Sequence, residues 1–89
     1  MAIKIFKYTL EVADRQVVQM PVGSKILAFQ FQRGVPCIWA LVAEGSVMKS
    51  RALRIHGTGH QINIDDTPTQ YVGTAQQGDS LVWHLFEEV

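Results

Sequence analysis

The sequence predicts a single all-β domain over residues 1–89, built as a compact antiparallel sandwich or a small barrel of about seven short strands. Apolar and polar residues alternate with a period of two almost from end to end, which is typical of half-buried strands. Turn-forming residues separate these runs, and no run combines a helical period with helix caps. A chain of 89 residues is also too short to bury two separate cores.

The strand runs can be placed in order along the chain. We expect strands at residues 6–12, 16–20, 26–32, 37–43, 48–56, 71–76 and 81–87. The second strand ends at Pro21, and the turn that follows contains Gly23. Most connections are short, which favours antiparallel neighbours. Residues 37–43 are all apolar, so we expect a central strand covered on both faces, by a second sheet or by a partner subunit.

The alternation within each strand predicts the buried side chains. The expected core comprises Phe6, Tyr8, Leu10, Val18, Leu27, Phe29, Trp39, Leu41, Leu53, Ile55, Trp83 and Leu85. Cys37 is the only cysteine and lies in the most apolar strand, so it forms no intramolecular disulfide and is expected to be buried and unreactive.

The charge balance excludes some classes of partner. Eight basic and eight acidic residues give a formal net charge of zero, whereas nucleic-acid-binding proteins usually carry a basic excess. Nucleic acid is therefore not the expected partner, although Lys49, Arg51 and Arg54 form a candidate basic patch. No apolar run approaches the roughly 20 residues that span a bilayer, and residues 1–7 lack a signal-peptide core. We expect a soluble intracellular protein without a membrane partner.

The long connection at residues 57–69 is the first candidate binding site. Long loops in small domains often carry recognition, and two glycines within three residues permit a close backbone approach to a ligand. The candidate binding residues are Gly57, Thr58, Gly59, His60, Asp65 and Asp66. In the competing interpretation this segment is only a turn and a return path, held to the core by Ile62 and Ile64.

Other reactive side chains do not form a recognised motif. His56 and His60 are four residues apart, a spacing that would place both on one face of a helix, but a strand end and a turn separate them here. Asp65, Asp66 and His84 complete no known set of metal ligands. The sequence also lacks a nucleophile elbow. We therefore expect no metal, no cofactor, no catalytic residue and no enzymatic activity.

Several motifs resemble a small uncharacterised family of proteins from bacteriophage and prophage genomes. The matching segments are Lys7-Tyr8-Thr9-Leu10, Met20-Pro21-Val22-Gly23, Pro36-Cys37-Ile38-Trp39-Ala40, Gly57-Thr58-Gly59-His60, Tyr71-Val72-Gly73-Thr74 and Val82-Trp83-His84-Leu85-Phe86-Glu87. This resemblance implies a non-catalytic accessory protein in the cytoplasm of the bacterial host. Such proteins often act by occluding a host protein, including components of antiviral defence.

Three functions remain in competition at this point. The first is a protein-binding module that docks a host or phage protein on one sheet face or on the loop at residues 57–69. The second is a homo-oligomer with a structural or assembly role. The third is a sponge that binds a small ligand such as a nucleotide through its glycine-containing loop and aromatic side chains.

Overall fold

Seven β-strands make up most of the protein in the computed structural model, which describes residues 2–89. They are β1 (Ile3–Thr9), β2 (Gln16–Pro21), β3 (Lys25–Gln32), β4 (Val35–Ala43), β5 (Met48–Gly57), β6 (Thr69–Gln77) and β7 (Leu81–Glu88). Residues 2–89 contain no helix that is long and apolar enough to cross a membrane. The predicted all-β class and the number of strands are confirmed.

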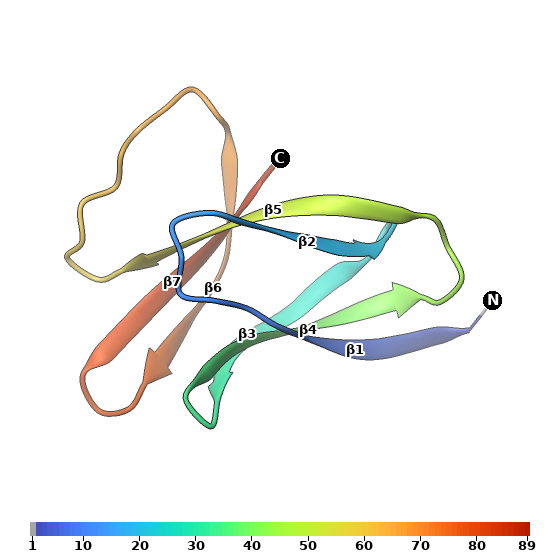
Figure 1. Cartoon of the computed structure of the whole chain (residues 1–89), viewed down its shortest axis with the longest axis horizontal. Coiled ribbons are helices and arrows are strands. Elements are labelled where there is room, and N and C mark those ends of the chain that lie inside the picture. Colours follow the sequence, from blue (N-terminus) through green and yellow to red (C-terminus); the bar gives the residue numbers. More distant parts are fainter. Residues whose placement is uncertain (1) are drawn as a thin grey trace.

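The strands form two antiparallel sheets (Figure 1). One sheet has three strands in the order β1-β4-β3, and the other has four in the order β2-β5-β7-β6. The chain changes sheet after β1, β2 and β4, whereas β3–β4 and β6–β7 are hairpins and the long β5–β6 connection joins two strands of the same sheet. β3 also packs against β6, so the two sheets meet along one side. The structure is thus a sandwich, one of the two architectures that the sequence left open.

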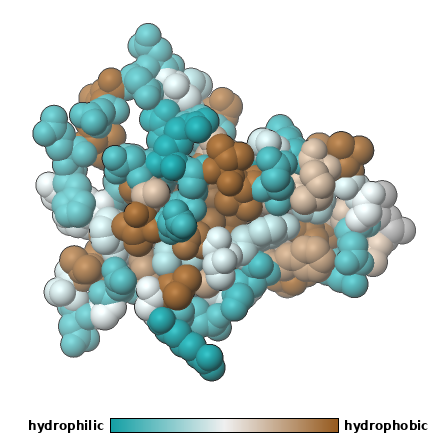
Figure 2. Space-filling model, viewed as in Figure 1, coloured by the Kyte–Doolittle hydropathy of each residue, from teal (hydrophilic) through white to brown (hydrophobic). Residues whose placement is uncertain are grey.

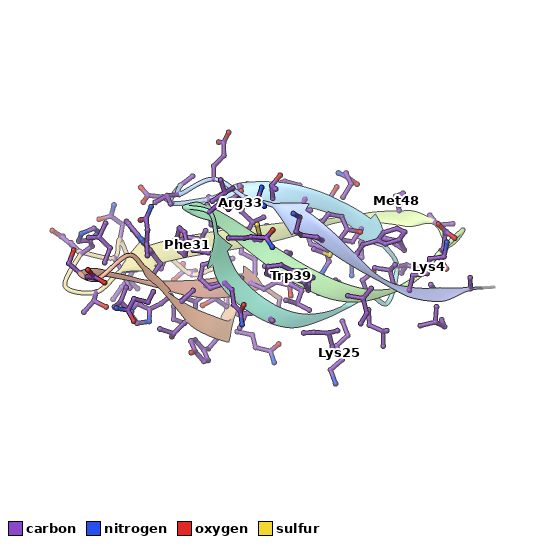
Figure 3. All side chains as sticks on the ribbon, turned by 90° about the horizontal axis from the view of Figure 1, so that it is seen from below. Lys4, Lys25, Phe31, Arg33, Trp39 and Met48 are labelled. Carbon is purple, nitrogen blue, oxygen red and sulfur yellow. The ribbon has the colours of Figure 1, made fainter. Side chains whose placement is uncertain are left out.

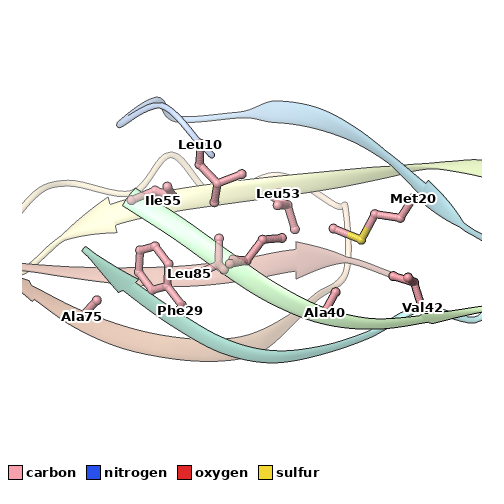
Figure 4. Close-up of a cluster of buried hydrophobic side chains, with 10 residues drawn as sticks. Leu10, Met20, Phe29, Ala40, Val42, Leu53, Ile55, Ala75 and Leu85 are labelled. Atoms are coloured by element: carbon pink, nitrogen blue, oxygen red, sulfur yellow. The ribbon is translucent and has the colours of Figure 1, made fainter. Parts of the chain in front are cut away.

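The core lies between the two sheets (Figure 4). Its buried side chains are Leu10, Met20, Phe29, Ile38, Ala40, Val42, Leu53, Ile55, Ala75 and Leu85. Partly buried side chains pack around them, namely Phe6, Tyr8, Val18, Ile26, Phe31, Val72 and Trp83. Nine of the twelve residues expected in the core belong to these two sets. The remaining three, Leu27, Trp39 and Leu41, do not.

The prediction for β4 was wrong about which of its two apolar faces is buried in the core. Register places Tyr8 and Phe29 opposite Ile38, and residues directly opposite each other share a face of the sheet. Ile38, Ala40 and Val42 therefore point into the core, and Trp39 and Leu41 point away from it. Trp39 is half-buried, and Leu41 is 39% exposed. The second covering layer that was expected on this strand is missing among the described residues.

A β-bulge explains the error at Leu27. The register of β3 against β4 shifts between Ile26 and Ala28, which leaves Leu27 without a directly paired residue. Ile26 lies opposite Ala40 on the core side, and Leu27 is 47% exposed. An uninterrupted period of two would have placed Leu27 on the same side as Phe29. The bulge breaks that alternation.

Candidate functional site

The Gly57-Thr58-Gly59-His60 segment is a β-turn at the end of β5. The backbone N–H of His60 donates to the Gly57 carbonyl oxygen at 3.1 Å, and Gly59 has a φ of 80°, which favours glycine at this turn position. A Cβ atom on Gly57 would lie 2.5 Å from Nδ1 of His60. The two glycines therefore serve the turn and the close approach of the His60 ring.

Thr58 and His60 fasten this turn to β7. The Thr58 hydroxyl lies 2.7 Å from Nε2 of His84, and the Nδ1 atom of His84 lies 3.0 Å from the Thr74 hydroxyl. The His60 ring meets the ring of Trp83 edge-on at a centroid distance of 5.6 Å. Thr58, His84 and Thr74 form an exposed network in which both ring nitrogens of His84 are hydrogen bonded to threonine hydroxyls. We assign it a structural role.

Asp65 belongs to an ion-pair network at the other end of the long loop (residues 58–68). Arg54 Nε donates to Glu88 Oε2 at 2.9 Å, and its terminal nitrogen lies 3.2 Å from Asp65 Oδ2. Arg15 Nε donates to the same Glu88 oxygen at 2.8 Å. The network joins the β1–β2 connection, β5, the long loop and the end of β7. Asp66 is exposed and belongs to neither group, so the six predicted binding residues do not converge on one point.

Hydrogen bonding sets the protonation of these carboxylates. The hydrogen bonds from Arg15 and then from Arg54 lower the pKa of Glu88. The backbone N–H of Thr67, followed by the Arg54 side chain, lowers the pKa of Asp65. The Glu88 hydrogen bond in turn raises the pKa of Arg54. All these groups are therefore charged at neutral pH, and the network is electrically balanced.

A small hollow lies beneath the long loop. It has a volume of about 150 Å³, and its walls include Arg54, His56, Ile62, Asn63 and Phe86. His56 lies against Phe86 at a ring-centroid distance of 5.9 Å. The surface over the loop, at the upper left of Figure 1, is mostly hydrophilic with hydrophobic atoms interspersed (Figure 2).

The basic patch predicted at Lys49, Arg51 and Arg54 does not exist as an anion-binding surface. Arg51 makes a bidentate ion pair with Glu87 and also donates to the backbone oxygen of Ser24. Glu88 and Asp65 neutralise Arg54. That prediction was wrong because residues distant in the sequence supply the carboxylates.

The three histidines face different neighbours. His56 lies against Phe86, His60 against Trp83, and His84 between two threonines. Among residues 2–89 no three histidine, cysteine, aspartate or glutamate side chains are grouped as metal ligands would be. Cys37 is 1% exposed, as predicted.

A second candidate surface is the outer face, which we define as the side of the β1-β4-β3 sheet that points away from the core (Figure 3). Register places Ile5 opposite Leu41 and Lys7 opposite Trp39 on this side. Ile3 is 62% exposed and Ile5 is 59% exposed. The outer face therefore presents adjacent apolar side chains to solvent along β1 and β4.

The polar part of the outer face covers Cys37. Lys7 on β1 reaches across β4 and donates from Nζ to Gln32 Oε1 on β3 at 2.8 Å. Its aliphatic stem therefore passes over Cys37, which lies between those two strands. Beside it lies a hollow of about 450 Å³ lined by Lys7, Thr9, Gln32, Arg33, Val35 and Cys37.

The sequence contained a signal for the outer face that the strand assignment missed. The first strand was expected to begin at Phe6, but it begins at Ile3, so Ile3 and Ile5 were left out of the pattern. Ile3 and Ile5 lie on the same face as Lys7, so the apolar side of this strand changes between Ile5 and Phe6, and both faces of β1 carry apolar residues. The uniformly apolar run at residues 37–43 was the other signal, because a strand with two apolar faces needs a cover on each.

Comparison with known proteins identifies the family of the chain. The comparisons with curated proteins and with solved structures each gave no match. A family model matches residues 1–89, and the chain therefore belongs to the family described as "Domain of unknown function (DUF7352)".

Proposed function

We propose that this protein is a non-catalytic protein-binding module and that it docks its partner on the outer face. The observation that carries the proposal is the directly opposed pair Ile5 and Leu41, which are 59% and 39% exposed beside the half-buried Trp39. Exposed apolar clusters of this kind mark interaction surfaces on soluble domains. Aromatic side chains at the centre of such surfaces often supply much of the binding energy.

The energetics support docking on this surface. Burial of apolar surface contributes about 25 cal/mol per Å², so 100 Å² removed from water is worth about 2.5 kcal/mol. β1 is also an edge strand of its sheet, since it pairs only with β4 among the described strands. Its other edge can accept backbone hydrogen bonds from an added strand. A partner can therefore use both the apolar side chains and the free strand edge.

The resemblance to phage and prophage proteins supports a partner in the cytoplasm of a bacterial host. A small domain that covers a surface of a larger protein inhibits it by occlusion, without any chemistry of its own. The functional proposal is therefore inhibition of a host or antiviral-defence protein through stable binding. A phage protein is the other partner class that this resemblance supports.

Affinity capture with matched variants tests the docking face. The immobilised protein is incubated with bacterial lysate, and the retained proteins are compared between the parent, Trp39→Ala, Leu41→Ser and Val17→Ser. Val17 is the control because it is 50% exposed and lies on β2 in the other sheet. The proposal requires a protein that the parent and Val17→Ser retain and that both outer-face variants lose. Equal retention by all four proteins would refute it.

The hollow beneath the long loop supports a second candidate function, the binding of a small ligand. Ile62, Ile64 and Phe86 supply apolar walls, and Asn63 and Asp65 supply polar groups at the margin. A volume of about 150 Å³ accommodates a single planar ring. Calorimetric titration with cytidine monophosphate and uridine monophosphate, whose bases are single rings, tests this function directly. Binding that Phe86→Ala abolishes would favour the ligand sponge over the protein-binding module.

A further inference from the structure

We propose that the outer face selects an acidic partner, namely an extended protein segment whose apolar side chains are flanked by carboxylates. This inference rests on the proposed function, since it names the chemistry of the partner that docks there. It is drawn from the distribution of charge around the apolar side chains, which the net charge of zero conceals.

The β1-β4-β3 sheet carries basic residues without acidic ones. Its three strands contain no aspartate or glutamate, whereas β1 contributes Lys4 and Lys7, β3 contributes Lys25, and the β3–β4 turn contributes Arg33. Glu44 neutralises Lys4 at 2.8 Å. Among residues 2–89 no carboxylate pairs with Lys7, Lys25 or Arg33.

The three uncompensated cations surround the apolar side chains. Lys25 lies opposite Leu41, and Lys7 lies opposite Trp39, so both belong to the outer face. Figure 3 shows Lys25 projecting at the margin of the sheet on β3 and Arg33 at the turn between β3 and β4. The arginines of the other sheet form ion pairs instead. The positive charge of the outer face is therefore available to a partner.

The hollow beside Cys37 is suited to a carboxylate. Lys7 and Arg33 both line it, together with the polar side chains of Thr9 and Gln32. Its volume of about 450 Å³ exceeds that of one acidic side chain, so a glutamate or aspartate can enter without displacing the strands. A carboxylate between a lysine and an arginine makes charge-assisted hydrogen bonds, which are stronger than neutral ones.

The backbone at Arg33 is independent support for a charge requirement there. Arg33 has a φ of 53° and Gly34 a φ of 79°, the pattern of a type I′ hairpin turn. Asparagine or glycine is the favoured residue at the first of these positions. An arginine in a left-handed conformation carries a steric cost that asparagine or glycine would avoid, and such costs are often found at functional sites. The proposed role of Arg33 accounts for that cost.

The charges disfavour a second copy of the chain, and the small number of aromatic side chains disfavours nucleic acid. A second copy docked face to face would bring Lys7, Lys25 and Arg33 toward the same cations of its partner. A nucleic acid would find one aromatic platform, Trp39, instead of the series that single strands stack upon. A segment with carboxylates beside apolar side chains can pair with the cations at the rim of this surface and pack against the apolar side chains at its centre.

Selection from a random peptide display library tests the proposal without knowledge of the partner. The parent protein is the bait, and a charge-reversed variant (Lys7→Glu, Lys25→Glu and Arg33→Glu together) is the matched bait. We expect the parent to enrich peptides with aspartate or glutamate beside apolar residues, and the variant to enrich lysine and arginine in their place. For an enriched peptide, the charge reversal should weaken binding at least tenfold, and raising NaCl from 50 to 500 mM should weaken it severalfold.

The controls separate this proposal from the proposed function. Enrichment of uncharged apolar peptides that Trp39→Ala abolishes would keep the docking face and overturn the acidic partner. Enrichment that neither Trp39→Ala nor Leu41→Ser reduces would overturn both. Three further results would each overturn the acidic partner: a dimer in sedimentation analysis that Ile5→Glu dissociates, tighter binding to a 20-nucleotide thymidine strand than to any peptide, or cosedimentation with phosphatidylserine vesicles.

Discussion

Glu88 Oε2 accepts hydrogen bonds from Arg54 Nε at 2.9 Å and from Arg15 Nε at 2.8 Å. One carboxylate at the end of β7 thereby holds the β1–β2 connection and β5 together. The long loop joins the same network through Asp65, which also pairs with Arg54. This arrangement links the protonation of two carboxylates to the stability of the fold.

Acid should destabilise the protein through this network. The pKa values of Glu88 and Asp65 are lowered in the folded state. Their contribution to the stability of the fold is therefore complete above the ordinary carboxyl range, and it is lost as the pH falls below about 4 through the folded pKa values. We expect the free energy of unfolding to be flat from pH 7 to about 5 and to fall below that range. Urea titrations at a series of pH values provide the measurement.

The Glu88→Gln variant tests whether Glu88 is responsible for the loss of stability in acid. It should be less stable than the parent at pH 7 and show a smaller loss on acidification, because its side chain cannot titrate. Glu44→Gln serves as the control, since the ion pair of Glu44 with Lys4 is about half exposed and such pairs contribute little. An acid profile that Glu88→Gln leaves unchanged would assign the pH dependence to other carboxylates.

Neighbouring positions on β4 should differ sharply in their contribution to stability. Ile38 is completely buried between the sheets, so Ile38→Ala should cost about 2–5 kcal/mol of unfolding free energy. Trp39 points to the outer face and is half-buried, so Trp39→Ala should cost less than Ile38→Ala, about 1–2 kcal/mol. Chemical denaturation compares the two directly. A larger loss for Trp39→Ala would mean that the other face of β4 is covered.

The contrast at β4 shows where sequence patterns stop being informative. Alternation identified seven strands, and about half of the core, because polar side chains mark the solvent side of a strand. On β4 both faces are apolar, so the pattern cannot choose between Ile38 and Trp39, and only pairing with β1 and β3 decides. The bulge at Leu27 has no side-chain signature either. The ion pairs of Arg54 depend on contacts between distant segments, which the sequence does not encode locally.

Gly57 and His60 should be energetically coupled. A methyl group at position 57 would meet the His60 ring at 2.5 Å, so Gly57→Ala must displace that ring from Trp83. We expect a loss of about 1 kcal/mol from Gly57→Ala in the parent and a smaller loss when His60 is already alanine. A double-mutant cycle of unfolding free energies measures this coupling. Strictly additive effects would show that the two residues act independently.

The long loop should contribute less to partner binding than the outer face. The triple variant His60→Ala, Asp65→Ala and Asp66→Ala removes the predicted polar contacts of the loop while leaving the strands intact. We expect unchanged strand content by circular dichroism and retention of the captured partner. Its melting temperature should fall slightly, because Arg54 loses one of its two carboxylates. Loss of the partner here, with Trp39→Ala binding normally, would transfer recognition from the sheet to the loop.

Replacement of Arg33 should separate stability from recognition. Asparagine adopts the left-handed conformation of this turn more readily than arginine, so Arg33→Asn should stabilise the fold by about 0.5–1 kcal/mol. The same change removes one of the two cations that line the hollow beside Cys37, so binding of an acidic peptide should weaken. Thermal denaturation and peptide titration on one preparation measure both effects. Arg33→Lys is the matched control, because it keeps the charge and the steric cost and should preserve most of the binding. If Arg33→Asn gained stability and bound acidic peptides as tightly as the parent, the turn conformation at Arg33 would have no connection with recognition.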